Sequence, residues 1–221
     1  MNDAAASLLD RLRHVDASSL SDADKSLRVV SSAIRPVASG VRMLGRAVTA
    51  EARGDLMSVI AALHESRPGD VLVINAGVAD RAIAGELFAS EAIRRGVAGI
   101  VIDGLCRDTP TLRQLAFPVY ARGATPIAAP ARRVPVTGTA VQIGGVEIQP
   151  GDLLLGDDDG IVVGTEQELA AAIDLAEAIQ AGEEGLRASI NRGTSIFATM
   201  NYDEHVARLR EGQDSALSLG I

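Results

Sequence analysis

The chain has 221 residues, of which 47% are hydrophobic and 2% aromatic, and its formal net charge is −8. This length allows one domain with a sizeable core, which must be built from Ala, Val, Leu and Ile because Trp is absent. The acidic balance excludes a typical nucleic-acid binder, which needs clustered Lys and Arg. We expect a cytoplasmic protein without a membrane partner, since the sequence lacks a secretory leader and any apolar run of membrane-spanning length.

Single residues exclude several catalytic chemistries. Cys106 is the sole cysteine, which rules out an internal disulfide and argues against a cysteine-based zinc site. Lys25 is the sole lysine, and it lies in a polar stretch without the apolar pocket that activates a Schiff-base lysine. The three histidines lie on separate predicted polar helices without metal-ligand spacing, so we assign them no chemistry.

The first part of the chain has a helical pattern over residues 3–15. Ser21, with Asp24 three residues later, predicts a short helix that begins at Ser21. Alternating apolar residues predict a strand over 42–52, and the following pattern predicts a helix that Asp55 caps.

The middle of the chain predicts a strand–helix–strand unit. Residues 70–77 read as a buried strand, 80–97 as a helix that Gly96 ends, and 98–104 as a second buried strand that Gly104 ends. A short helix over 109–116 and a strand over 117–123 follow.

Residues 139–163 predict an antiparallel meander with three turns, at Gly144–Gly145, Pro150–Gly151 and 158–160. A long helix over 165–191 and another around 205–210 complete the chain. Together these elements indicate a layered α/β domain, and no G-x-G-x-x-G turn supports a dinucleotide-binding fold. We divide the chain into an N-terminal helix (1–20), an α/β catalytic core (21–164), and a C-terminal helix and tail (165–221) at a subunit interface.

Polar side chains follow both buried strands of this unit, where ligands usually bind in α/β domains. The first strand end supplies Asn75, Asp80 and Arg81, and the second supplies Asp103, Arg107 and Asp108. The carboxylate of Asp108 suits Mg²⁺ or Mn²⁺, and the planar fork of Arg107 matches a substrate carboxylate. Backbone N–H groups between Gly85 and Phe88 complete an anion cradle. Such a set would stabilise an enolate beside a carboxylate.

Simpler interpretations stay open for the same residues. On residue chemistry alone, Asp108 or Thr109 as the cap of the next helix is the stronger interpretation, and Glu86 is typical of a solvated helix residue. The "GDDDG" run at 156–160 lies between two strands, which favours a tight acidic hairpin over a metal cluster.

The chain resembles the family that contains 4-hydroxy-4-methyl-2-oxoglutarate aldolase and the regulator of ribonuclease activity A, often labelled as demethylmenaquinone methyltransferases. The similarity spans about 21–191. It is carried by "GDVLVINAG", "GELFASEAIRRGVAGIVIDGLCRD", "FPVYARGATP" and "VEIQPGDLLLGDDDGIVV". Its most specific signal is an acidic residue followed, after twenty residues, by Arg-Asp, which here is Glu86 and then Arg107–Asp108.

The resemblance implies a layered β/β/α "swivelling" fold, assembled as homotrimers or homohexamers with sites at subunit interfaces. It implies that Asp108 ligates Mg²⁺ or Mn²⁺, that Arg107 holds the pyruvate carboxylate, and that Glu86 holds a metal-bound water. Pyruvate-binding amides fall at Leu87 and Phe88, next to Gly85. A further metal-bound water is held by a glutamate from the C-terminal helix of a neighbouring subunit, matched here by Glu183, with Glu184 and Glu177 as alternatives.

Three departures from the family pattern stand out. Glu86 replaces the aspartate of the aldolases, "NAGVADRAI" replaces a more glycine-rich turn, and the tail beyond Gly193 has no match. The resemblance implies a class II pyruvate lyase acting on a 4-hydroxy-2-oxo acid, such as 4-hydroxy-4-methyl-2-oxoglutarate, with oxaloacetate decarboxylase activity. The alternative is a non-catalytic, protein-binding regulator of ribonuclease activity. Methyl transfer lacks support because no glycine loop for S-adenosylmethionine is visible.

Overall fold

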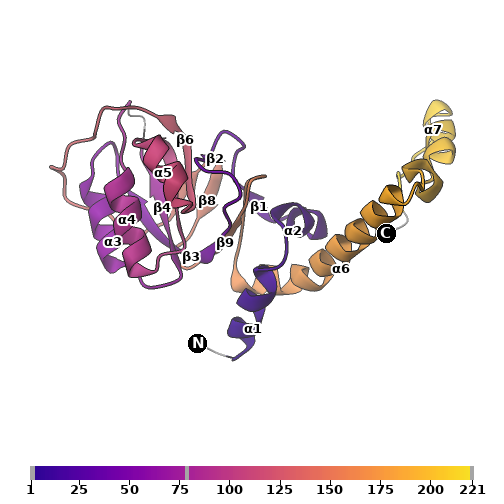
Figure 1. The fold of residues 1–221 in the computed structure, drawn as a ribbon, viewed down its shortest axis with the longest axis horizontal. Helices are drawn as coiled ribbons and strands as arrows, with labels where there is room; N and C mark the ends of the chain where they lie inside the picture. The colour runs from indigo at the N-terminus through magenta and orange to yellow at the C-terminus, as the bar shows by residue number, and fades with distance from the viewer. Residues whose placement is uncertain (1–2, 78–79, 220–221) are drawn as a thin grey trace.

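The computed structural model describes residues 3–77 and 80–219. Its centre is an eight-stranded mixed sheet (Figure 1). The strands are β1 (Arg28–Val29), β2 (Arg35–Pro36), β3 (Met43–Glu51), β4 (Asp70–Asn75), β5 (Gly99–Cys106), β6 (Val119–Ala124), β9 (Leu153–Gly156) and β10 (Ile161–Gly164). Their order is β1-β10-β9-β3-β4-β5-β6-β2. The four central strands β3 to β6 run parallel, and the outer strands pair antiparallel.

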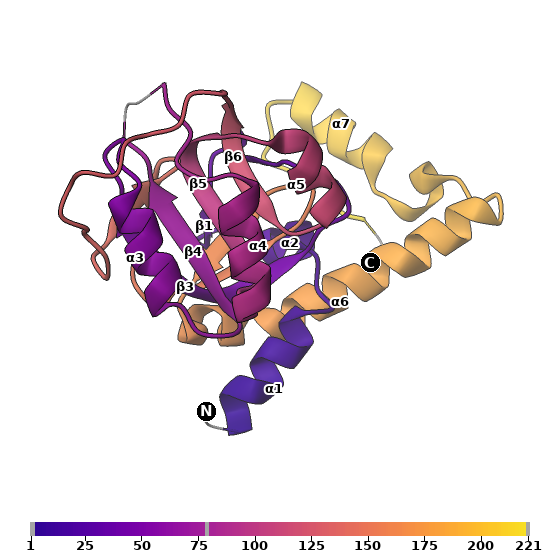
Figure 2. The same ribbon diagram turned by 60° about the vertical axis from the view of Figure 1, so that its left-hand side comes forward.

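The central strands are apolar on both faces because both faces are covered, as is usual for parallel sheets. Helices α3 (Met57–Glu65), α4 (Glu86–Arg95) and α5 (Thr109–Leu115) cover one face (Figures 1 and 2). There Leu72 and Ile74 of β4 pack in the same cluster as Ala89 and Ala92 of α4.

A hairpin of β7 (Val141–Ile143) and β8 (Val146–Ile148) covers the opposite face of the sheet. Val71 and Val73 of β4 pack there with Val141 and Ile143. Successive side chains of β4 point to opposite faces of the sheet, so they belong alternately to the cluster under the helices and to the cluster under the β7–β8 hairpin. The predicted layered β/β/α fold is confirmed.

A third cluster lies beside β9 and β10. It joins α1 (Asp3–Leu12) and α2 (Ala17–Ala23) to the beginning of α6 (Glu166–Asn191). Only the first half of α6 is buried, through residues that end at Ala176. The rest of α6 projects away from the sheet and leads to η1 (Ile196–Thr199) and α7 (Tyr202–Arg210), neither of which contains a buried residue (Figures 1 and 2).

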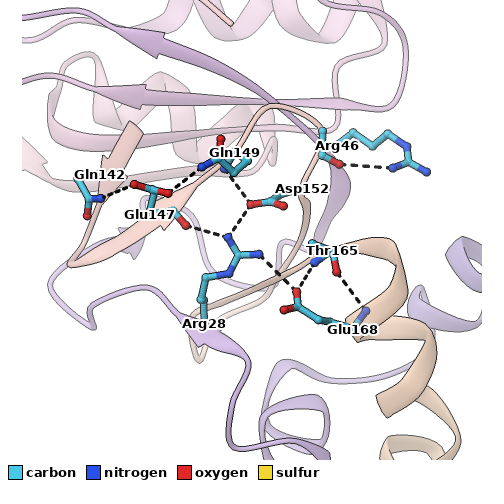
Figure 3. A network of polar contacts seen from close by, with 9 residues as sticks. Arg28, Arg46, Gln142, Glu147, Gln149, Asp152, Thr165 and Glu168 are labelled. Carbon is cyan, nitrogen blue, oxygen red and sulfur yellow. Dashed lines mark hydrogen bonds and ion pairs between the residues drawn. The ribbon is translucent and has the colours of Figure 1, made fainter. Parts of the chain in front are cut away.

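A polar network anchors the first turn of α6 to the sheet (Figure 3). Arg28 donates to Asp152 at 2.6 Å and to the carbonyl oxygen of Glu147 at 2.8 Å. Its other Nη lies 3.6 Å from Glu168, which forms a capping box with Thr165. Asp152 is buried, so this arginine compensates a carboxylate that would otherwise be costly to desolvate.

Several predicted boundaries are wrong. The helix expected after Ser21 is α2, which begins at Ala17 and contains Ser21, because burial of Ala17 and Leu20 moves its start. The helix expected over 80–97 begins only at Glu86. Strand β5 continues past Gly104 to Cys106, with an irregular register between Ile102 and Leu105.

The predicted meander is divided between two sheets. The β7–β8 hairpin forms its own small sheet, whereas β9 pairs with β3 in the large one. The acidic run between β9 and β10 is the expected hairpin: Asp158 accepts hydrogen bonds from the N–H of Gly40, and Asp157 accepts one from the N–H of Ala17. The predicted helices over 165–191 and 205–210 correspond to α6 and α7.

Candidate active site

The segment before α4 runs alongside the end of β5 and brings the two halves of the site together. Ala82 bridges both Leu105 and Ala128, and the N–H of Ile83 donates to the carbonyl of Leu105 at 3.1 Å. The N–H of Arg107 then donates to Ala84 at 3.0 Å. This pairing explains why the expected helix starts late: the backbone of residues 82–84 hydrogen-bonds to the end of β5 instead of forming helical turns.

Gly85 lies directly against the Arg107–Asp108 pair. A Cβ at this position would overlap the carboxylate of Asp108 and would lie 2.8 Å from Cγ of Arg107. The backbone of Gly85 is extended, with φ −161°, so its conformation suits any residue. Glycine is therefore required here because there is no room for a Cβ, and not because the backbone conformation demands it.

Asp108 has the position of a helix cap but not its hydrogen bond. It precedes α5 with a left-handed backbone (φ 58°), a conformation that aspartate adopts more readily than most residues, and its side chain makes no cap bond to α5. Instead its Oδ2 accepts from the N–H of Glu86 at 3.2 Å and lies 3.4 Å from Nε of Arg107. The carboxylate thus faces the positive end of α4, where an anion is favoured.

A pocket of about 420 Å³, which we call the α3–α4 groove, opens beside this pair. It is lined by Ile60, Leu63, His64, Gly85, Leu87, Phe88, Glu91, Arg95, Arg107 and Asp108. The side chains of Arg107 and Asp108 are 41% and 32% exposed, so both are accessible to a ligand. Leu87 and Phe88 lie in the first turn of α4, where backbone N–H groups have no partner within the helix. A second pocket, of about 310 Å³, lies on the α5 side of the same pair.

Glu86 meets Asp108 through its backbone rather than its carboxylate. Its side chain lines neither of the two pockets beside Asp108. Within residues 3–77 and 80–219, no group of three or more His, Cys, Asp or Glu side chains could hold a metal ion. Asp108 is the accessible carboxylate beside Arg107, and one such ligand suits an ion such as Mg²⁺, which keeps most of its waters, and does not suit a closed zinc site.

Glu183 lies on the part of α6 that projects from the body of its own chain (Figure 2). The same helix segment carries Glu184, and Glu177 forms an ion pair with Arg11 of α1. The assignment of Glu183 to a neighbouring subunit's site stays a prediction.

The remaining predicted polar residues gather in a different place. Asn75, Asp80 and Asp103 line an open pocket of about 620 Å³ together with Arg122. Asp103 pairs with Arg122, and its Oδ2 accepts from the N–H of Gly144 at 2.6 Å. Asp103 thus faces the β7–β8 layer, so the strand ends carry two polar sites rather than the single one expected. Arg81 is exposed and donates to the carbonyl of Ala128.

Sequence reasoning missed the part of the groove formed by His64, Glu91 and Arg95. Leu87, Glu91 and Arg95 repeat every four residues, which places them on one face of α4 and is a signal available from sequence. No local sequence pattern predicts that His64 of α3 lies beside α4, because the two helices are distant in the sequence.

Cys106 immediately precedes the pair but is buried. Burial raises the pKa of its thiol, and the charge of Asp108 raises it further. A high pKa and a buried position exclude this thiol as a ready nucleophile.

Comparison with known proteins identifies the family of this α/β fold. The family model described as "RraA-like: Aldolase/RraA" matches residues 6–163, and the chain belongs to this family. A relative from Halalkalibacterium halodurans, provisionally named a 4-hydroxy-4-methyl-2-oxoglutarate aldolase, is 34% identical over 92% of this chain and 97% of its own length.

Two solved structures share the fold at 30% sequence identity. An uncharacterized protein from Pseudomonas syringae pv. tomato superposes with a TM-score of 0.77 over 86% of this chain and 94% of its own. The RNA-processing inhibitor RraA from Thermus thermophilis superposes with a TM-score of 0.62 over 67% and 91%, respectively. In the part of the chain that the structure describes, every helix is too short or too polar to cross a membrane.

Proposed function

We propose that the chain is a divalent-metal-dependent carbon–carbon lyase. It would cleave a 4-hydroxy-2-oxo acid, such as 4-hydroxy-4-methyl-2-oxoglutarate, into pyruvate and a second carbonyl compound, and it would decarboxylate oxaloacetate. The observation that carries this proposal is the placement of Asp108, which leaves α5 uncapped and turns to the first turn of α4 beside Arg107. The similarity to relatives provisionally named as aldolases supports it.

Arg107 is the group that would bind the carboxylate of the 2-oxo acid. Its guanidinium is part-exposed at the mouth of the groove, and a planar fork of N–H donors matches a carboxylate in two parallel hydrogen bonds. The N–H groups of Leu87 and Phe88 would bind the other polar end of pyruvate at the start of α4. Gly85 keeps this approach open because it has no side chain.

Asp108 would hold Mg²⁺ or Mn²⁺, with Glu86 and, from a neighbouring subunit, Glu183 acting through water. When bound, the ion supplies the positive charge that favours the enolate form of pyruvate. Two cationic partners would then share the negative charge of substrate and enolate, namely the ion and the guanidinium of Arg107.

The cleavage moves one proton in each half of the reaction. A base removes the proton of the C4 hydroxyl, C4 becomes a carbonyl as the C3–C4 bond breaks, and the electron pair passes into the pyruvate enolate. A proton then returns to C3 and gives pyruvate. Glu86 would relay these protons through a water, since its carboxylate is carried by the first turn of α4 but does not itself line the groove.

The test measures pyruvate release from oxaloacetate and from 4-hydroxy-4-methyl-2-oxoglutarate, with Mg²⁺ and with excess chelator. We expect chelator to abolish release and Asp108→Asn to lower kcat/KM by about 100-fold or more, the order reported for loss of a charge-stabilising group. Asp159→Asn is the matched control, since Asp159 is an exposed residue of the β9–β10 hairpin. Full metal-dependent activity in Asp108→Asn would contradict the proposed role.

A second candidate is a protein-binding regulator without chemistry of its own. It is favoured by the similarity to the RNA-processing inhibitor RraA and by the acidic net charge of −8. The test is whether the purified chain, without metal, inhibits RNA cleavage by a ribonuclease complex. Inhibition together with no pyruvate from either acid would put this candidate first.

A further inference from the structure

The α3–α4 groove is longer than a five-carbon acid requires. It is lined by both Leu87 and Arg95 of α4, eight residues apart. At 1.5 Å per residue, these positions are separated by about 12 Å along the helix axis. A 2-oxo acid whose carboxylate contacts Arg107 would occupy only the near end, beside Asp108. The remaining length is available to whatever substituent the substrate carries beyond C4.

The walls of the groove are mainly apolar, and its polar side chains His64, Glu91 and Arg95 lie toward the end away from Asp108. Ile60 and Leu63 of α3 face Leu87 and Phe88 of α4 across the groove. Leu87 is 72% exposed and Ile60 is 40% exposed, although both sit at the edge of a well-formed pocket. Adjacent exposed apolar side chains in a concave site are typical of a surface that a ligand covers.

The charged groups along the groove already have partners. Glu91 accepts two hydrogen bonds from Arg94, both at 2.6 Å. Arg95 donates to the carbonyl oxygens of His64 and Ser66 at the end of α3, at 2.7 and 3.1 Å. The Nε of Arg95 has no hydrogen-bond partner, but it is enclosed by the protein. A second substrate carboxylate in this part of the groove would lie close to the carboxylate of Glu91 and would find these Arg95 donors already engaged, which is unfavourable.

We propose that the groove binds the C4 substituent of the substrate through apolar contacts, and that the preferred substrates carry an alkyl chain of several carbons there. This inference rests on the proposed lyase function and names its substrate class. The reaction is the same cleavage: the C4 hydroxyl loses its proton, C3–C4 breaks, and C3 takes up a proton. The products are pyruvate and an aliphatic aldehyde or ketone, and the alkyl chain stays on the latter.

The experiment compares kcat/KM for pyruvate release from 4-hydroxy-2-oxo acids with methyl, propyl and pentyl groups at C4, and from 4-hydroxy-4-methyl-2-oxoglutarate, all with Mg²⁺. We expect kcat/KM to rise with chain length by about fourfold per buried methylene, the equivalent of its transfer from water. The pentyl acid should exceed 4-hydroxy-4-methyl-2-oxoglutarate. Flat or falling values across the alkyl series, with the dicarboxylic acid preferred, would overturn this inference and leave the lyase function intact. If no acid, including oxaloacetate, yields pyruvate, both proposals fail.

A pair of isoleucine variants locates the effect. Ile60→Ser should lower the ratio of kcat/KM for the pentyl acid to that for the methyl acid by about fourfold, the worth of one methylene contact. The ratio cancels any loss of activity common to both substrates. Ile93→Ser is the control, because Ile93 is 42% exposed on α4 and does not line the groove. If the ratio is unchanged in Ile60→Ser, or falls equally in Ile93→Ser, the groove does not bind the alkyl chain.

Discussion

Individual residues of the site are constrained by space as much as by chemistry. Gly85 has an ordinary extended backbone, yet any larger residue would meet the carboxylate of Asp108. Asp108 in turn adopts a left-handed backbone that few side chains tolerate, at the point where it leaves α5 uncapped. Residues held in sparsely populated conformations are common at functional sites. The two residues thus depend on each other.

Gly85→Ala tests this dependence. The added methyl group should push Asp108 away from the N–H of Glu86 and lower pyruvate release by about tenfold or more, since a displacement of about 1 Å at a catalytic site has such effects. Activity and thermal unfolding would be measured together.

Gly185→Ala provides the control because Gly185 lies within α6 with open space around it. There alanine should raise the free energy of unfolding by about 0.5–1 kcal/mol, which gives the effect on stability of the same change where no neighbouring side chain is in the way. Unaltered activity in Gly85→Ala would show that the close approach has no catalytic consequence.

At the scale of elements, Arg28 links a buried carboxylate, Asp152, to Glu168 in the first turn of α6. Arg28 of β1 donates a hydrogen bond to Asp152 and forms an ion pair with Glu168; these contacts, that with Asp152 above all, raise the pKa of Arg28 (Figure 3). Because β1 contains only two residues, few backbone hydrogen bonds fix this edge strand, and the Arg28 network adds side-chain contacts to it.

Arg28→Met should lower the free energy of unfolding by about 2 kcal/mol, because it leaves Asp152 buried without its charge partner while Arg28 itself is partly exposed. Chemical denaturation would measure the change. Lys25→Met is the matched control: Lys25 pairs with Asp22 at the surface, and such a pair contributes about 0–1 kcal/mol. Equal losses in the two variants would contradict a special role for the buried pair.

At the scale of the whole molecule, the two halves of α6 have different surroundings. All of α6 follows the segment matched by the family model, which ends at residue 163. Its first half is buried against α1, α2 and the β9–β10 edge of the sheet, and its second half projects with the tail (Figure 2). Glutamates on the projecting half, Glu183 among them, are placed to reach another copy of the chain if the protein forms the predicted trimer or hexamer.

Mixing two inactive variants tests whether sites are shared between subunits. Asp108→Ala and Glu183→Gln should each lose activity alone, whereas mixed oligomers formed by co-expression should recover about a quarter of the wild-type rate, since that share of interface sites has both native residues. No recovery in mixed oligomers would mean that Glu183 does not act across an interface. Recovery measured after mixing folded, non-exchanging oligomers gives the background.

The sequence by itself was sufficient to determine the order and type of most elements. Continuous apolar runs in β4 and β5 indicated a covered parallel sheet, and the spacing from Glu86 to Arg107–Asp108 indicated the family and the candidate site. These features are local or depend on one motif, so they can be predicted without knowledge of the contacts between distant segments.

Only the tertiary structure decided which strand ends meet. Residues 82–84 hydrogen-bond to the end of β5 instead of continuing their helical pattern, and Asp103 faces the β7–β8 layer whereas Asp108 faces α4. The approach of α3 to α4, which forms the groove, likewise joins residues that are distant in sequence. Pairing and packing between such segments compete with local propensity and override it, which is why the groove could not be predicted from the sequence.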